Sequence, residues 1–475
     1  MKLKEDIDIK ENIDKKEDID IKEVLEKTKL FRSKNNENIR DTIVTTIYKT
    51  AEDITKKTVV KDTDRLLSQH KIDDIITSKK TGIPIMILML AVIFWLTIQG
   101  ANYPSQLLAK FLFWIEAKIG IFFIYIQVPL WLNNFLVLGV YRTFAWVVAV
   151  MLPPMAIFFP IFTLLEDGGY LPRVCFNLDH VFKKACCHGK QALTMCMGFG
   201  CNAAGVIACR IIESPRERLI AIVTNNFVPC NGRFPTLIAL SMVFVGASFS
   251  SASSSIIAAL MVVVLVLIGI GITLFTSYIL SKTILKGMPS SFTLELPPYR
   301  KPQLGRVLYT SIIDRSMFVL SRAIIVAIPA GAITYILGNV MIGDISILAH
   351  AANFLNPFAK LIGLDGFILI AFVLGFPANE IVLPILLMAY LSKGSMLQFE
   401  SISQLRDILL NNGWTYLTLI NTMLFSLLHF PCATTVWTIK KETGSIKWTI
   451  LSVLMPTAIA IIICFCTTQI YRLIF

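Results

Sequence analysis

The chain has 475 residues, of which 55% are hydrophobic and only 16% charged, with a mean hydropathy of +0.68. This composition excludes a soluble globular domain, and several apolar runs of about 20 residues predict a polytopic, all-α membrane protein. The net charge is +12, yet residues 1–82 hold 19 Lys and Arg against 18 Asp and Glu. The excess therefore lies in short loops between apolar runs, which is typical of loops on the inner side of a membrane rather than of nucleic-acid binding.

In chain order, the sequence begins with a charged segment that contains KEDIDIK twice, at 4–10 and 16–22. Weak helical periodicity over 38–80 predicts short amphipathic helices below the membrane. The first span is predicted at 83–99, and the aromatic residues 101–141 are interpreted as interfacial or half-inserted helices. Further spans are predicted at about 143–165, 254–281, 318–340, 366–391, 415–437 and 447–472, with two short apolar segments at 191–212 and 219–246 and a basic, proline-rich loop at 282–316.

The stretch from Glu166 to Pro235 is unusually polar and rich in glycine and proline for a chain of this composition. Backbone broken at membrane depth is tolerated only where protein or a water-filled cavity satisfies its polar groups. The excess of basic loops falls on one side only if 191–212 and 415–437 are re-entrant hairpins, with breaks at GFG (198–200) and HFPC (429–432). Seven to nine crossings are expected, and the break residues are the expected place of function.

The sequence also contains an internal echo. GFGCNAAGV at 198–206 matches GFPANEIVL at 375–383 with an offset of 177, and FVPCNGRFPT at 227–236 matches HFPCATTVWT at 429–438. Two halves with broken segments are typical of transporters in which both halves contribute to a central site.

Several residues at these breaks could bind a cation. Cys201, Cys230 and Cys432 each lie at or beside a break, and a thiolate with nearby oxygens suits a borderline metal such as Fe²⁺; the alternative is that each is a small packing residue. Glu380 lies in an apolar span, where a carboxyl is costly unless it is paired or lines a water-filled path.

Other polar residues have more open interpretations. Asn202, Asn226 and Asn379 offer neutral amide ligands or interhelical hydrogen bonds. Glu166 and Asp167 end a span and could form a mouth of the path. His429 could be a ligand, although a core histidine is favoured. Four arginines are interpreted as marking the cytoplasmic boundary of the membrane: Arg210, Arg216, Arg218 and Arg233.

Taken together, LLEDGGYLPR, GFGCNAAGV with SPRERL, NNFVPCNGRFP, LELPPYR, GFPANE and FPCATTVWTIKKETGSIKW resemble the membrane region of the FeoB-type ferrous iron transport protein B family. The match covers residues 60–475. It implies two Gate modules with broken or re-entrant helices and inward movement of Fe²⁺ across a bacterial plasma membrane, with a cytoplasmic N-terminus. The transport path would be lined by Cys201, Cys230, Cys432, Glu380, Asn202 and Asn379. The corresponding organisation is a tail (1–37), a juxtamembrane region (38–82), a first span with interfacial helices (83–144), Gate modules at 145–245 and 325–440, a central region (246–324) and a C-terminal span (441–475).

Two departures from the family pattern matter. The family normally begins with a G domain that carries a P-loop, and no P-loop is present here, so we expect a separate G-domain protein to supply any GTPase activity. Many members also carry Lys before the acid of the second Gate motif, where this chain has Asn379 before Glu380. The loss of a buried cation leaves Mn²⁺ or another divalent ion as an alternative cargo.

Expected partners are lipid, Fe²⁺, the G-domain protein, a small cytoplasmic accessory protein and a second copy of the chain, with no nucleic acid and no permanently bound cofactor. A carrier of nucleoside-like solutes and a non-transporting receptor or regulatory subunit are the alternatives. No nucleophile–base pair or HExxH motif is present, so the sequence predicts no enzyme.

Overall fold

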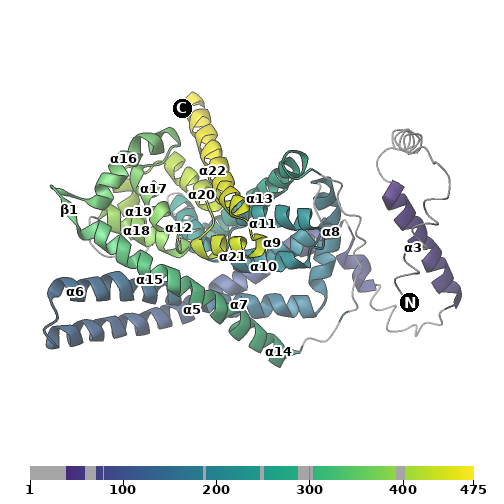
Figure 1. The fold of residues 1–475 in the computed structure, drawn as a ribbon, viewed down its shortest axis with the longest axis horizontal. Coiled ribbons are helices and arrows are strands. Elements are labelled where there is room, and N and C mark those ends of the chain that lie inside the picture. The colour runs from purple at the N-terminus through teal and green to yellow at the C-terminus, as the bar shows by residue number, and fades with distance from the viewer. Residues whose placement is uncertain are drawn as a thin grey trace, which may run out of the picture. The chain divides into compact units, whose positions relative to one another are not determined.

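The computed structural model describes residues 39–58, 71–78, 80–185, 189–245, 251–286, 299, 303–391 and 402–474 (Figure 1). These residues are almost entirely helical. The strands among them are β1 (Met341–Ile342) and β2 (Ile345–Ser346), which pair antiparallel with Met341 opposite Ser346. The prediction of an all-α protein is confirmed.

The chain forms two units, Met1–Ser68 with Ser291–Thr293 and Gln69–Ser290 with Leu294–Phe475. The described part of the first is α3 (Ile39–Thr58), where Ile43, Ile47 and Ile54 are exposed. This helix was expected from its periodicity. The repeated KEDIDIK segment and the Cys186–Cys187 pair lie outside the described residues.

The second unit contains the remaining helices. Its first half comprises α5 (Gly82–Tyr125), α6 (Leu130–Asn134), η1 (Phe135–Tyr141), α7 (Arg142–Asp167), α8 (Tyr170–Lys184), α9 (Lys190–Gly200), α10 (Asn202–Ala208), η2 (Cys209–Ile211), α11 (Pro215–Thr224), η3 (Asn225–Phe227), α12 (Phe234–Val245) and α13 (Ser251–Lys282). Its second half comprises α14 (Leu304–Tyr309), η4 (Thr310–Met317), α15 (Phe318–Asn339), α16 (Ile347–Leu361), α17 (Gly366–Leu374), η5 (Asn379–Ile381), α18 (Val382–Tyr390), α19 (Ile402–Asn411), α20 (Tyr416–Leu428), α21 (Ala433–Thr443) and α22 (Ile446–Ile474).

Within the described residues, five helical stretches are long and apolar enough to cross a membrane: Leu130–Asp167, Leu260–Lys282, Leu304–Asn339, Tyr416–Thr443 and Ile446–Ile474. A sixth arises if α16 and α17, which meet at 112°, form one bent span. Shorter apolar helices, such as Asn202–Ile211 and Asn379–Tyr390, do not reach across a bilayer core of about 30 Å alone. The expectation of seven to nine crossings stays a prediction. The protein is a multi-pass membrane protein.

Three local expectations are corrected. Residues 101–125 continue the helix of the predicted first span, because α5 runs through Pro104 for 44 residues. The part of the 282–316 loop from Leu304 onward is helical and belongs to the Leu304–Asn339 stretch. Residues 415–437 are not a hairpin: α20 and α21 together form one 28-residue candidate span, and the sharply bent pair is α16 with α17.

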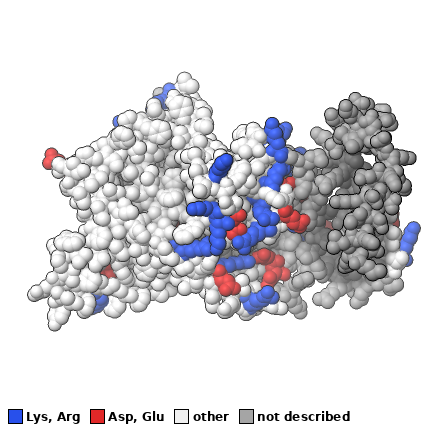
Figure 2. Space-filling model, in the orientation of Figure 1, with Lys and Arg blue, Asp and Glu red and all other residues white. Residues whose placement is uncertain are grey.

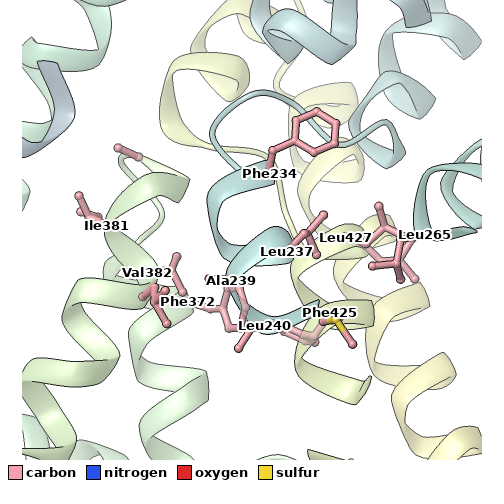
Figure 3. Close-up of a cluster of buried hydrophobic side chains, with 14 of the residues drawn as sticks. Phe234, Leu237, Ala239, Leu240, Leu265, Phe372, Ile381, Val382, Phe425 and Leu427 are labelled. Atoms are coloured by element: carbon pink, nitrogen blue, oxygen red, sulfur yellow. The ribbon is translucent and has the colours of Figure 1, made fainter. Parts of the chain in front are cut away.

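One part of the hydrophobic core surrounds α12, which packs against α13 and α20 (Figure 3). Phe234, Leu237 and Leu240 are buried, and Phe372 of α17 and Phe425 of α20 lie in the same cluster. Phe372 and Phe425 pack edge to face with ring centroids 5.0 Å apart. Inside a bilayer the hydrophobic effect does not drive helices together, because lipid tails are as apolar as leucine. Close packing of this kind stabilises the helix contacts instead. The core therefore joins the two halves of the chain.

Charged side chains gather over one part of the visible surface, and the remainder is nearly uncharged (Figure 2). Ion pairs with an exposed member include Arg210–Glu442 at 2.7 Å and Lys190–Glu213 at 3.2 Å. The broad uncharged surface suits contact with lipid, and the charged region suits water or headgroups.

Candidate functional site

The first helix break lies at Cys201. Helix α9 ends at Gly200, Cys201 is extended with φ −157° and ψ 126°, and α10 starts at Asn202. A Cβ at Gly200 would lie 2.7 Å from the ring of Phe158, so only glycine fits beside α7 at this point. The expected break at GFG is confirmed.

The matching break of the second half lies at Ala378, 177 residues after Cys201. Ala378 is extended with φ −151° and ψ 118°, nearly the backbone angles of Cys201, and the 3₁₀ turn η5 follows it. The two matched sequence segments thus have the same local backbone conformation at their breaks.

The two Pro-Cys segments each make a hydrogen bond to the break of their own half. Asn231 N donates to Gly200 O at 3.4 Å, and Ala433 N donates to Phe376 O at 2.8 Å. Asn231 and Ala433 are separated by 202 residues, which is the offset of the second sequence match. In each half, the broken helix is therefore hydrogen-bonded to the Pro-Cys segment of the same half. The expected break at HFPC is confirmed between α20 and α21.

A buried cavity of about 30 Å³ lies where the four broken segments meet. Its lining includes every residue expected on the path: Cys201, Asn202, Cys230, Asn379, Glu380 and Cys432. Met151, Gly200, Gly232, Val319, Ala323, Pro377, Ala378 and Thr434 complete it. Residues separated by more than two hundred positions in the chain thus surround one small space.

The Glu380 carboxylate is the charged group of the cavity. It is 6% exposed and has no ion-pair partner among the described residues. Its Oε1 lies so close to Gly232 that a Cβ there would stand 2.5 Å away. The Trp146 indole donates to Glu380 O at 3.4 Å and fixes the backbone. An unpaired buried carboxylate favours a cation or a proton beside it.

The thiols and amides around this carboxylate are held by weak contacts. The Asn379 amide donates to Cys230 Sγ at 3.9 Å, and Cys432 Sγ lies 3.2 Å from Thr435 Oγ1. One terminal atom of the Asn202 amide lies 3.2 Å from Gly198 O and 3.1 Å from Val228 O, and the other lies 3.4 Å from Asn226 Oδ1. All three neighbours are acceptors, so the two orientations of the amide place its oxygen on opposite sides.

No three or more His, Cys, Asp or Glu in the described part of the chain are arranged to hold a metal ion. The thiols and the carboxylate that line the cavity are therefore spread around its wall and not grouped at one point.

Arg233 lies in the interior of the bundle, not at the inner boundary as the sequence suggested. It is 1% exposed, and its guanidinium donates to Leu427 O at 2.7 Å, Asn226 O at 2.9 Å and His429 O at 3.0 Å. Further bonds reach Asn226 Oδ1 and Phe430 O, both at 3.2 Å. The carbonyls at the end of α20 have no further helical partners, and Arg233 satisfies them. Its position within the predicted apolar segment 219–246 is the sequence feature that could have indicated burial.

The other candidates lie outside the cavity. Glu166 pairs with Arg315 at 3.3 Å, and Asp167 is exposed at the end of α7. Arg210 pairs with Glu442 near the charged surface. His429 is 1% exposed, and its ring nitrogens lie near Ser426 O at 2.9 Å and Asn379 Oδ1 at 3.4 Å, as in a core histidine.

Comparison with known families matches two models. The model described as ferrous iron transport protein B C terminus matches residues 262–314. The Gate model, described as nucleoside recognition, matches twice, at 148–245 and 320–446. Two Gate modules were expected from the family resemblance, in agreement with the internal repeat, and the exact module boundaries stay predictions.

Curated relatives align over most of the chain. The Fe(2+) transporter FeoB of Staphylococcus aureus (strain MSSA476) is 29% identical over 422 residues, which cover 87% of this chain and 60% of the relative. The Fe(2+) transporter FeoB of Methanocaldococcus jannaschii is 27% identical over 446 residues, covering 91% and 63%. A fusion of Fe(2+) transport protein A with Fe(2+) transporter FeoB from Porphyromonas gingivalis is 27% identical over 456 residues, covering 85% and 51%.

The matched region is thus about 60% of the length of the first of these relatives. No solved structure matches the chain.

Proposed function

The chain belongs to the ferrous iron transport protein B family, and on that premise we propose that it carries Fe²⁺ across a membrane through the cavity at its helix breaks. One observation supports this above others: six residues expected to line an ion path surround a single cavity of about 30 Å³. The proposed direction is inward across a bacterial plasma membrane, with the N-terminus in the cytoplasm. The charged side chains gathered over one part of the visible surface (Figure 2) would then face the cytoplasm.

The size of the cavity favours an ion over an organic solute. Its volume of about 30 Å³ has room for only a few water molecules, whereas sites for small organic ligands measure about 300–1,000 Å³. An ion must therefore shed most of its waters to enter. The thiols of Cys201, Cys230 and Cys432 and the amide oxygens of Asn202 and Asn379 would replace part of that hydration shell.

We assign to Glu380 the role of compensating the positive charge of the transported ion. The carboxylate has no cationic partner in the described residues, so an entering divalent ion supplies one. Helix α9 ends at Gly200 in the cavity wall, and the negative end of a half-helix favours cations. Ligand chemistry of this kind also admits Mn²⁺, which is the alternative cargo.

The partners follow from the relatives rather than from the cavity. The Porphyromonas gingivalis relative is joined to an Fe(2+) transport protein A, which supports a small accessory partner of that type. We also propose that a G-domain protein acts on this chain when it is not joined to one, and that Glu166 and Asp167 lie near the inner mouth of the path. A non-transporting receptor is disfavoured, because a buried unpaired carboxylate has no packing role.

The test is uptake of radiolabelled Fe²⁺ into proteoliposomes under anaerobic, reducing conditions, with Mn²⁺, Zn²⁺ and a nucleoside as competitors. Glu380→Ala and Glu380→Gln should abolish uptake, and single Ser replacements of Cys201, Cys230 and Cys432 should slow it or change the order of competing metals. Cys466→Ser is the control, because this exposed thiol lies on α22 away from the cavity. Uptake by the wild type that is inhibited by the nucleoside but not by Mn²⁺ would overturn the proposal. If the wild type shows no flux, the same assay is repeated with a candidate G-domain protein and GTP, and failure there also overturns it.

A further inference from the structure

A second, larger pocket of about 270 Å³ is formed by residues of α5, α7, α8, α9 and α13. All of its lining residues are hydrophobic. Those on α9 are spaced by three and four residues, so they share one face of the helix: Ala192, Met195, Cys196 and Phe199. The apolar pocket is separate from the ion cavity, because no residue lines both.

The apolar pocket opens on the outside of the helix bundle. Four of its lining residues are 41–51% exposed: Ile83 and Ile87 of α5, Val181 of α8 and Leu267 of α13. On the inner side the lining is buried, as at Phe182, which is 2% exposed. One side of the pocket is therefore open to the surroundings, and the bundle closes the other.

The wall on α13 places the apolar pocket at membrane depth. Leu267 and Leu274 lie on either side of the middle of the candidate span Leu260–Lys282. The wall on α5 runs from Ile83 to Ile93, a length of about 15 Å, which is half of a hydrocarbon core of about 30 Å. The pocket therefore has about the depth of one leaflet of a bilayer.

The surroundings of the mouth supply an apolar occupant. An apolar cavity of about 150 Å³ stays dry and takes up apolar guests, and this pocket is larger. If it were empty, its lining would lose dispersion contacts, whereas lipid tails next to the mouth are as apolar as leucine. An acyl chain of a lipid therefore fits the pocket by chemistry, by length and by access.

Basic side chains lie at one end of the apolar pocket. Lys184 ends α8 and follows Val181 by three positions, so it lies on the pocket side of the helix. Lys183 pairs with Asp179 at 2.8 Å, whereas Lys184 is exposed and has no ion pair with the described residues. Lys80, which is also exposed, precedes α5 and its lining residues. These amines suit the phosphate of a lipid headgroup.

The inner wall of the apolar pocket also supports the first helix break. Phe158 lines the pocket, and a Cβ at Gly200 would stand 2.7 Å from its ring. Gly200 in turn lines the ion cavity. Phe158 stacks on Phe162, another lining residue, with ring centroids 5.8 Å apart. An occupant of the pocket therefore holds these rings against the break.

We propose that the apolar pocket binds one acyl chain of an anionic phospholipid, with the headgroup phosphate at Lys184 and Lys80. The bound lipid fills the space between the helices and supports Phe158 against Gly200. This inference goes beyond the proposed function and does not depend on it, because the observations that support it concern the lipid-facing side of the bundle.

Lipid binding is measured by native mass spectrometry of the purified full chain in detergent. The protein is titrated with phosphatidylglycerol, which is anionic, and separately with phosphatidylcholine, which is zwitterionic. The wild type is expected to retain one phosphatidylglycerol with an affinity about fivefold or more above that for phosphatidylcholine, because one lysine near an anionic headgroup contributes about that factor.

Two variants fill the pocket and test the position of the acyl chain. Ala192→Leu and Cys196→Phe should weaken phosphatidylglycerol binding by about tenfold or more, because losing the burial of about two methylenes is worth that factor. Ala117→Leu is the matched control, since Ala117 is exposed on α5 and does not line the pocket.

A further pair of variants tests the headgroup. Lys184→Gln should lower the affinity for phosphatidylglycerol toward that for phosphatidylcholine and leave the affinity for phosphatidylcholine unchanged. Lys441→Gln is the control, because Lys441 is exposed on α21, which contributes no residue to the pocket. Equal affinity of the wild type for the two lipids, unchanged by Lys184→Gln, would overturn the headgroup assignment.

Equal phosphatidylglycerol affinity of Ala192→Leu, Cys196→Phe and the wild type overturns the lipid site. A wild type that binds no phospholipid also overturns it, which is the result expected if a helix of another protein or a second copy of the chain fills the pocket. If the filled variants fail to fold, the wild type is photolabelled with a phosphatidylglycerol that carries a diazirine at the end of one acyl chain. Labelled peptides from 83–93 or 192–199 then support the site, and labels confined to other segments overturn it.

Discussion

The carboxylate of Glu380, in the second Gate segment, lies directly against Gly232 in the first. A Cβ added at Gly232 would stand 2.5 Å from Glu380 Oε1 and 2.8 Å from Glu380 Cδ. Gly232 and Glu380 both line the cavity, so the contact joins the two segments at the point where the ion is proposed to pass. The Glu380 carboxylate can occupy this position because Gly232 has no side chain.

Gly232→Ala is therefore expected to reduce Fe²⁺ uptake by about tenfold or more while the fold survives, because a displacement of about 1 Å in a functional group can cost that much. The added methyl displaces only the flexible end of Glu380, so the melting temperature in detergent should change little. Gly271→Ala on α13 is the control, since nothing lies within 4 Å of a Cβ there. Equal uptake by Gly232→Ala and Gly271→Ala would show that the position of Glu380 is unimportant.

Arg233→Lys should destabilise the protein by about 2–4 kcal/mol, because an ammonium cannot reach the carbonyls that the planar guanidinium joins and buried acceptors lose their partner. The buried guanidinium connects Asn226 of the first half with Leu427, His429 and Phe430 of the second. Thermal unfolding of the purified protein in detergent measures the loss.

The control for Arg233 is Arg210→Lys. The Arg210 side chain is 63% exposed, and its ion pair with Glu442 is screened by solvent, so little change is expected. A melting temperature of Arg233→Lys that equals that of Arg210→Lys would contradict a structural role for the buried guanidinium.

Gly363→Ala should cost more stability than Gly343→Ala, although both glycines have φ near +70°. At Gly363, φ is +69° and a Cβ would lie 2.5 Å from both Asn421 Nδ2 and Thr468 Oγ1, whereas at Gly343, φ is +67° and nothing lies within 4 Å. The backbone strain of about 1–2 kcal/mol is common to both. The difference in unfolding free energy then reports the disruption of the Asn421 hydrogen bonds, and equal losses would exclude it.

At neutral pH, Tyr299→Phe should be less stable than the wild type. The difference in stability between the two should become smaller as the pH rises. Tyr299 donates to Asp73 Oδ1 at 2.8 Å, and its ring lies 4.0 Å from the Arg173 guanidinium. Burial, followed by the hydrogen bond to Asp73, raises the pKa of Tyr299 from its usual 10.0 to about 12.

The sign of this pH dependence follows from proton linkage. The folded pKa exceeds the unfolded one, so the folded state retains the proton, and the contribution of Tyr299 to stability is complete below pH 10 and declines between pH 10 and about 12. Unfolding of the wild type and Tyr299→Phe, followed upward from neutral pH, measures the difference between them. A difference that grows with pH would contradict the assignment.

Much of the helical architecture follows from local sequence. Long apolar runs must form helices in a bilayer, since no water is available to bond the backbone, and spans such as α13, α15 and α22 lie where hydropathy predicted them. Glycine and proline located the breaks at Gly200 and between Leu428 and Ala433 because they weaken a helix locally. The offset of 177 residues anticipated that Cys201 and Ala378 share one backbone conformation.

Other features depended on contacts that are distant in sequence. Hydropathy could not distinguish a hairpin from a continuous span at α20 and α21, because the angle at a break is set by the packing of both halves. Arg233 resembles a boundary arginine in sequence. In the structure, hydrogen bonds to the carbonyl groups at the end of α20 stabilise the buried guanidinium of Arg233.

The sequence by itself determined the class of the protein, the positions of its helix breaks and the residue types available to bind an ion, because each depends on local composition and backbone preference. The tertiary structure decided which of those residues meet. It brings Cys201, Cys230, Cys432 and Glu380 to one cavity and separates Glu166 and Asp167 from it. These relationships depend on the packing of broken helices against one another, which no local pattern encodes.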